Sequence, residues 1–219
     1  MNAGSKGMPG ILRASAGGGK KGCMTGPLPD FDAAYRAGTP PWDIGRPQAE
    51  VVALAEAGEI VGNVLDAGCG TGEHALWLAS LGKRVMGVDA SSEAIARARA
   101  KAAERGLAVP FQVADALQLG RLHRRFETVL DVGLFHVFPD EARRPYAESL
   151  CEVLAPGGKL HVLCFSDEEP EGPGPRRVQE YDLRATFRSL FAMVDVRPAR
   201  FERLGAEPAK AWRATLVRI

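Results

Sequence analysis

A glycine-rich turn between an apolar run and a helical pattern constrains this chain more than any other feature. The apolar run ends at Asp66, glycines follow at positions 68, 70 and 72, and a helical pattern begins at once. A dinucleotide-binding turn has the spacing Gly-x-Gly-x-x-Gly and holds a pyrophosphate at the helix N-terminus. Here the spacing is Gly-x-Gly-x-Gly, and the negative charge of Glu73 would repel a pyrophosphate. The turn therefore predicts a nucleotide-like ligand without phosphates, of which S-adenosylmethionine is the common example.

Acidic residues recur where the predicted strands end. After the strand that ends at Asp66, three further strand-like runs end in carboxylates, at Asp89, Asp115 and Asp131. Ligands of doubly wound sheets bind across the carboxyl ends of neighbouring strands, so these groups are expected around one site. Asp89 follows Asp66 by 23 positions, close to the spacing at which a carboxylate binds a ribose diol. Asp115 is then expected to accept from the adenine amino group, and Asp131 and Val132 stand at the mouth of the fourth strand.

This pattern resembles the class I S-adenosylmethionine-dependent methyltransferases. The resemblance covers roughly residues 35–219 and is strongest over 65–72, 87–89, 114–116 and 154–159. It implies S-adenosyl-L-methionine as the cofactor. It also implies a cofactor site made of Asp66, Gly68, Gly70, Thr71, Gly72, Asp89, Ala90, Asp115, Ala116, Asp131 and Val132.

The stretch 38–48, Gly-Thr-Pro-Pro-Trp-Asp-Ile-Gly-Arg-Pro-Gln, is more specific within that class. It is similar to the N-terminal signature of the branch that contains thiopurine, thiol, halide and tellurite-resistance-type methyltransferases. By this resemblance, Trp42 covers the methionine part of the cofactor and Arg46 meets its carboxylate. The plant halide and thiol enzymes carry further tryptophans upstream, where this chain has Tyr35. The resemblance therefore leaves the acceptor open.

The order of elements predicts an α/β fold. Strands are expected near 62–66, 84–89, 109–114, 126–132 and 159–165, and helices near 32–37, 48–57, 73–81, 91–105, 141–154 and 180–190. Ser91 or Ser92 is expected to cap the helix over 91–105, and Asp140 the helix over 141–154. Two apolar stretches, 191–201 and 211–219, are expected to form a terminal hairpin. Together these features predict a Rossmann-like, doubly wound, seven-stranded, mostly parallel sheet with an antiparallel C-terminal edge hairpin.

Composition favours a single soluble domain. Residues 1–26 are rich in Gly, Ser and Lys without a hydrophobic period, which predicts a disordered tail before a domain over 27–219. The net charge of +1 offers no footprint for nucleic acid, and no apolar run approaches the length of a membrane span. The four cysteines include no Cys-x-x-Cys pair, which favours reduced thiols in a cytoplasmic protein. A monomer without a metal is expected, and the basic residues of the helix over 91–105 are expected to form a solvated face.

The expected reaction is in-line methyl transfer to a small-molecule thiol, halide, hydroxyl or ring nitrogen. His136 is the candidate general base, and Phe135 and Phe138 are candidates for an apolar wall beside the acceptor. The Pro- and Gly-rich stretch 166–177 is a candidate lid.

Two alternatives remain at this point. One is a cofactor-binding protein without catalytic activity. The other is a nicotinamide-dependent reductase, which the glycine spacing and the absence of a Tyr-x-x-x-Lys pair disfavour.

Overall fold

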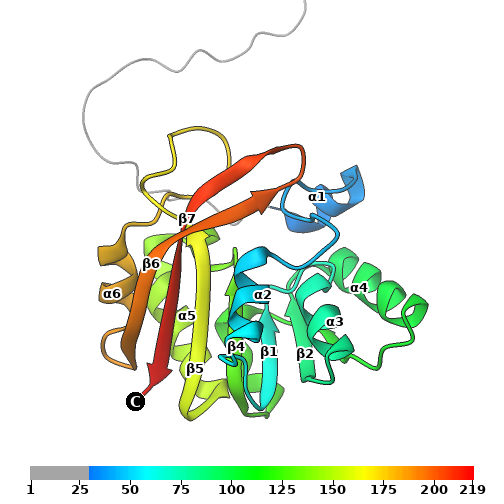
Figure 1. Cartoon of the computed structure of the whole chain (residues 1–219), viewed down its shortest axis with the longest axis horizontal. Coiled ribbons are helices and arrows are strands. Elements are labelled where there is room, and N and C mark those ends of the chain that lie inside the picture. The colour runs from blue at the N-terminus through cyan, green and yellow to red at the C-terminus, as the bar shows by residue number, and fades with distance from the viewer. Residues whose placement is uncertain (1–29) are drawn as a thin grey trace, which may run out of the picture.

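A computed structural model describes residues 30–219 (Figure 1), and the predicted tail over 1–26 lies outside the described residues. Within these residues, seven strands form one sheet in the order β3-β2-β1-β4-β5-β7-β6. Their bounds are Asn63–Ala67 for β1, Arg84–Asp89 for β2, Phe111–Val113 for β3, Phe126–Val132 for β4, Leu154–Phe165 for β5, Phe191–Arg203 for β6 and Ala206–Arg218 for β7. The first five strands run parallel, and β7 pairs antiparallel with both β5 and β6. The predicted fold class is confirmed.

Helices cover both faces of the sheet (Figure 1). Their bounds are Phe31–Ala37 for α1, Ala49–Glu56 for α2, Glu73–Ser80 for α3, Ser92–Glu104 for α4, Asp140–Val153 for α5 and Glu180–Phe187 for α6, with short 3-10 segments η1 (Ala116–Leu122) and η2 (Phe135–Val137). Successive strand residues point to opposite faces. Val64 accordingly belongs to a core cluster that includes residues of α2, α3 and α4, and Leu65 to one that includes residues of α5 and α6. This alternation builds a separate core on each face.

Of the two helix caps predicted from the sequence, one was confirmed and one was wrong. The Ser91 hydroxyl accepts a hydrogen bond from the Ala94 N–H at 3.0 Å and caps α4, as expected. The prediction of an Asp140 cap on α5 was wrong, because the cap residue is Pro139 and Asp140 is already helical. A proline there fits, since its fixed φ of −66° and ψ of 164° lead the chain into the first turn.

The architecture brings distant segments together above the sheet. In Figure 1 the carboxyl end of β5 points to the top of the view, where α1 and the turn of the β6–β7 hairpin also lie. The Leu204 N–H, at that turn, donates to the Pro41 carbonyl at 2.7 Å. The carboxyl ends of the parallel strands are therefore flanked by the N-terminal segment and by the hairpin.

Candidate functional site

The glycine turn after β1 adopts a conformation that only glycine takes easily. Gly68, Gly70 and Gly72 have φ angles of 72°, 52° and 84°. A Cβ atom at Gly70 would lie 2.8 Å from the Tyr35 hydroxyl, and one at Gly72 would lie 2.7 Å from the Phe111 ring. The Gly70 N–H donates to the Asp89 carboxylate at 2.8 Å. The turn is thus closely packed, and it joins the ends of β1 and β2.

Asp89 stands where β2 ends and is half-buried. One of its oxygens accepts from the Gly70 N–H and the other from the Ser91 N–H, both at 2.8 Å. Burial raises the pKa of this carboxyl, and the two backbone donors oppose the rise. The backbone therefore holds the carboxylate in one orientation at the mouth of the sheet. Its predicted contact with a ribose stays a prediction.

Asp66 is a buried carboxyl near the end of β1. It is 1% exposed, and within residues 30–219 neither of its oxygens has a hydrogen-bond partner. Burial raises its pKa to about 7, and the charges of Asp89 and Asp131 add to the rise. An unpaired buried carboxylate is costly unless a cation or a donor meets it. The Asp66 carboxyl therefore fits a ligand with a positively charged end.

Asp131, by contrast, has hydrogen-bond partners within the protein at both of its carboxylate oxygens. One oxygen accepts from the Leu134 and Phe135 N–H groups at 2.9 and 3.1 Å, and the other accepts from the Tyr146 hydroxyl at 2.8 Å. Its side chain is completely buried, and burial raises its pKa to about 6. These contacts hold η2 and α5 against the sheet. Its neighbour Val132 is half-buried at the end of β4.

The remaining predicted cofactor residues lie at the ends of β2 and β3. Asp115 is exposed; it accepts from the Leu117 N–H at 2.9 Å and from the Gln118 side chain at 3.0 Å, and so starts η1. Ala90 is exposed, and Ala116 is half-buried. The structure thus brings them to the same edge of the sheet as Asp89.

The N-terminal signature lies against the glycine turn. The Trp42 indole N–H donates to the Tyr35 hydroxyl at 3.0 Å, and the two rings meet edge to face at 6.2 Å between centroids. Because that hydroxyl also packs on Gly70, Trp42 is placed beside the turn through Tyr35. Arg46 instead forms two hydrogen bonds with the Glu202 carboxylate, at 3.0 and 2.7 Å. The structure thus pairs Arg46 with the hairpin.

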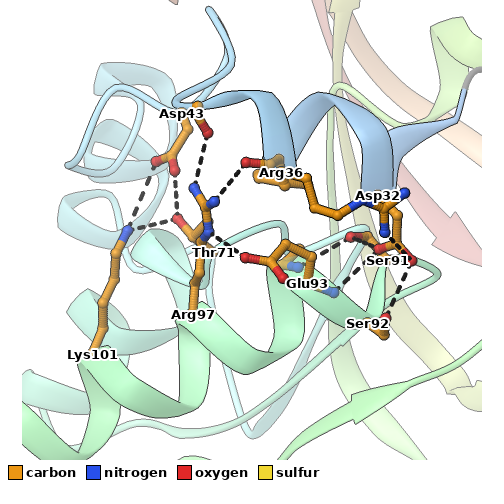
Figure 2. A network of polar contacts seen from close by, with 12 residues as sticks. Asp32, Arg36, Asp43, Thr71, Ser91, Ser92, Glu93, Arg97 and Lys101 are labelled. Carbon is orange, nitrogen blue, oxygen red and sulfur yellow. Dashed lines mark hydrogen bonds and ion pairs between the residues drawn. The ribbon is translucent and has the colours of Figure 1, made fainter.

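Thr71 and Glu73 meet basic side chains of α4, and Figure 2 shows Lys101 reaching toward Thr71. The Thr71 hydroxyl donates to Asp43 at 2.9 Å and accepts from Lys101 at 2.6 Å. Glu73 pairs with Lys101 at 2.7 Å and with Arg105 at 2.9 Å. The charge argument against a pyrophosphate was therefore wrong, because two cations neutralise Glu73.

The prediction of a solvated basic face on α4 was also wrong. Besides Lys101 and Arg105, the Arg97 guanidinium donates to the carbonyls of Tyr35 and Gly38 at 2.5 and 2.9 Å. These contacts hold α1 across α4 (Figure 2). Charge patterning along one helix does not reveal acceptors that come from another segment.

His136 is buried between the sheet and the hairpin. Its Nδ1 accepts from the Phe165 N–H at 3.0 Å, and its ring packs on Phe165 and Phe201 at 5.0 and 5.8 Å between centroids. Burial, together with the charge of Arg177, lowers its pKa to about 3. In this structure the ring is therefore neutral, and one nitrogen is committed to the backbone.

Phe135 and Phe138 do not form the expected wall beside an acceptor. Phe135 packs on Phe187 at 5.5 Å, and Phe138 packs on Tyr146 at 4.6 Å between centroids. Both rings are buried in the core under α5 and α6. The prediction of an apolar wall was wrong because it rested on the position of the two residues in a loop. The structure shows that both side chains point into the core.

Two arginines of the stretch 166–177 form hydrogen bonds and an ion pair that hold it in place. Arg177 donates to the carbonyls of Pro170 and Pro175, at 2.7 Å in the shortest contact to each, and Arg176 pairs with Asp140 at 2.5 Å. The lid role stays a prediction.

Within residues 30–219, no three His, Cys, Asp or Glu side chains are grouped so that they could hold a metal ion. Among the helices of that same part of the chain, none has the length and apolar character of a membrane span.

Known proteins resemble this chain along most of its length. A methyltransferase domain model matches residues 64–158. The 2-heptyl-1-hydroxyquinolin-4(1H)-one methyltransferase of Mycobacteroides abscessus is 42% identical over 188 residues, which are 81% of this chain and 83% of that protein. Probable thiol methyltransferase 2 of Arabidopsis thaliana is 29% identical over 84% of each chain. A structure solved for the conversion of a disulfide bond into a thioacetal group during echinomycin biosynthesis is 40% identical, with a TM-score of 0.79 over 86% of this chain and 91% of that one.

Proposed function

The chain belongs to the S-adenosylmethionine-dependent methyltransferases, and we propose that it methylates an acidic hydroxyl group on a planar aromatic heterocycle. Membership makes the protein an enzyme that uses S-adenosylmethionine and acts on small molecules, and it removes the reductase and the non-catalytic protein as alternatives. When bound, the cofactor supplies a methyl group that is already activated by the sulfonium charge.

The chain's own residues divide the work of holding that cofactor. We infer that Asp66 faces its positively charged methionine end, because this carboxyl is buried and no group within residues 30–219 forms a hydrogen bond with it. Asp89 is fixed by two backbone donors and would accept from the ribose hydroxyls, and Asp115 would meet the adenine. Trp42 and Tyr35 would cover the glycine turn and exclude water.

The proposed acceptor class rests on the hydrogen-bond partners and the charge of the titratable groups near the end of β4. Asp131 has protein partners at both oxygens, and His136 is neutral with Nδ1 committed to the backbone. Neither group is placed to take a proton from an acceptor. A nucleophile that ionises by itself needs no base, and an aromatic N-hydroxyl or a thiol meets that condition.

Two further observations support an aromatic hydroxyl. The 42% identical relative is named for a hydroxyquinolone substrate. Aromatic side chains also flank the strand ends, with Trp42 and Tyr35 on one side and Phe165 and Phe201 on the other. A thiol is the second candidate, because a relative of 29% identity is named as a thiol methyltransferase.

Three acceptors test the proposal, two of which differ only in the N-hydroxyl group. The purified protein is given S-adenosylmethionine with 1-hydroxyquinolin-4(1H)-one, with quinolin-4(1H)-one, or with thiophenol, and S-adenosylhomocysteine release is measured. We expect turnover of the hydroxylated quinolone and a rate that follows ionisation of the acceptor as the pH rises. Turnover of thiophenol alone would favour the thiol candidate. If the pH profile did not change with the acceptor, a protein group would be acting as the base, and the proposal that none does would be refuted.

A further inference from the structure

Lys101, on α4, contacts three polar side chains from two other parts of the chain. Its ammonium donates to the Thr71 hydroxyl at 2.6 Å and to Glu73 at 2.7 Å, and it lies 3.8 Å from the Asp43 carboxylate. Thr71 completes the set by donating to Asp43 at 2.9 Å. Figure 2 shows the lysine reaching from α4 toward Asp43 and Thr71.

The three partners belong to the elements that surround the cofactor site. Thr71 stands in the glycine turn, directly after Gly70, whose N–H fixes Asp89. Asp43 follows Trp42 in residues 30–48, which we term the cover segment. Glu73 starts α3. Lys101 therefore links the cover segment to the glycine turn without belonging to either.

The link lies largely out of solvent, so it is not a screened surface pair. The Asp43 and Glu73 side chains are 10% and 8% exposed, and that of Lys101 is 25% exposed. Charge-assisted hydrogen bonds in such partly buried sites are stronger than those in water. Arg105 also binds Glu73, at 2.9 and 3.0 Å, but it donates neither to Thr71 nor to Asp43. Loss of Lys101 would leave Glu73 paired with Arg105. It would also leave the Thr71–Asp43 hydrogen bond without its cation, which would weaken the link between the cover segment and the turn.

We propose that Lys101 is a positioning residue for cofactor binding, which holds the cover segment and the glycine turn in one geometry through Asp43 and Thr71. The proposal rests on the cofactor site assigned above. Lys101 acts on the cofactor only through these two neighbours, and its ammonium touches neither Asp66 nor Asp89. Its removal would lower the fraction of molecules whose cover segment is closed, so cofactor affinity would fall by the same factor.

Two variants that remove a cation from the same carboxylate provide the test. Lys101→Met and Arg105→Met each take one partner from Glu73, but only Lys101→Met breaks the contacts with Thr71 and Asp43. Calorimetric titration with S-adenosylhomocysteine is expected to show about tenfold weaker binding for Lys101→Met, equal to about 1.4 kcal/mol. Arg105→Met is expected to stay within about twofold of the unaltered protein, since a partly exposed pair contributes little.

Hydrogen–deuterium exchange and steady-state kinetics separate positioning from a general loss of stability. Lys101→Met should speed exchange in peptides covering residues 31–48, and it should raise KM for S-adenosylmethionine while kcat changes little. Arg105→Met should do neither. Equal weakening by both variants, or unchanged binding in Lys101→Met, would overturn the proposal.

Thr71→Val provides a second route if Lys101→Met does not fold. It removes the hydroxyl that accepts from Lys101 and donates to Asp43, and it should weaken binding to a similar extent. Undiminished binding in Thr71→Val would also overturn the proposal. A failure of the unaltered protein to bind S-adenosylhomocysteine would instead refute the cofactor site itself.

Discussion

Replacement of Asp66 by asparagine is expected to stabilise the protein and to weaken cofactor binding at the same time. The carboxyl is fully buried without a hydrogen-bond partner among the described residues, and burial raises its pKa from 3.8 to about 7. That rise corresponds to about 4 kcal/mol of unfavourable free energy for the ionised form. Asparagine has nearly the same shape and carries no charge.

The sign of the pH dependence follows from this raised pKa. Between pH 4 and pH 7, the folded protein holds the Asp66 proton more tightly than the unfolded chain does. The free energy of unfolding therefore falls as the pH rises through that window, and the loss is complete above about pH 7. Asp66→Asn lacks this proton, so its stability advantage should grow by about 2 to 3 kcal/mol between pH 5 and pH 8.

Urea unfolding of both proteins at several pH values measures this difference. Contributions from buried titratable groups that do not interact with Asp66, such as His136, are shared by the two proteins and cancel in the comparison. Asp195→Asn, on the exposed face of β6, serves as the control for loss of a negative charge. Parallel stability curves for Asp66→Asn and the unaltered protein would refute the reasoning.

The same variant should bind S-adenosylhomocysteine about 1.5 to 3 kcal/mol more weakly, because the ligand ammonium loses its charged partner. A variant that is more stable and binds less well cannot be explained by misfolding. Unchanged affinity would remove Asp66 from the cofactor site.

Three further substitutions test other parts of the site. Asp89→Ala should weaken S-adenosylhomocysteine binding by about 1 to 3 kcal/mol in calorimetry, and unchanged affinity would remove the ribose assignment. Tyr146→Phe leaves one buried Asp131 oxygen without its donor, so thermal unfolding should show a loss of about 1 to 3 kcal/mol; an equally stable variant would contradict the contact. His136→Ala should lower stability by about 1 to 3 kcal/mol through the unpaired Phe165 N–H, while S-adenosylhomocysteine affinity stays unchanged. Loss of turnover without loss of stability would restore His136 as a base.

Features carried by neighbouring residues were predictable from the sequence. The glycine turn, the strand that ends at Asp89 and the Ser91 cap each depend on a few adjacent positions, and the structure has all three. The limits of longer elements were less accurate. β5 begins at Leu154 and not near 159, because Leu154 pairs with Phe126 before an irregularity in the register. Pairing with a distant strand decided that boundary.

Features that depend on distant partners were not predictable. Arg46 and Glu202 are 156 positions apart, and the long side chains that meet there follow no short pattern. Asp131 stands at a strand end like Asp89, yet the Tyr146 hydroxyl from α5 satisfies it. Sequence position thus predicted which acidic residues lie at one edge of the sheet, and tertiary packing decided which of them lack partners within the protein.

The contacts between the cover segment and the hairpin can form only late in the synthesis of the chain. The Pro41 carbonyl, the Arg46 guanidinium and the Gln48 side chain all bind residues 202–204. At ordinary synthesis rates, about 8 to 30 s separate the two ends of the Arg46–Glu202 pair. A nascent chain that already holds β1 to β4 therefore has its glycine turn and strand ends before residues 202–204 are available to bind the cover segment. If the cover segment encloses the cofactor as proposed, this enclosure is among the last parts of the molecule to be completed.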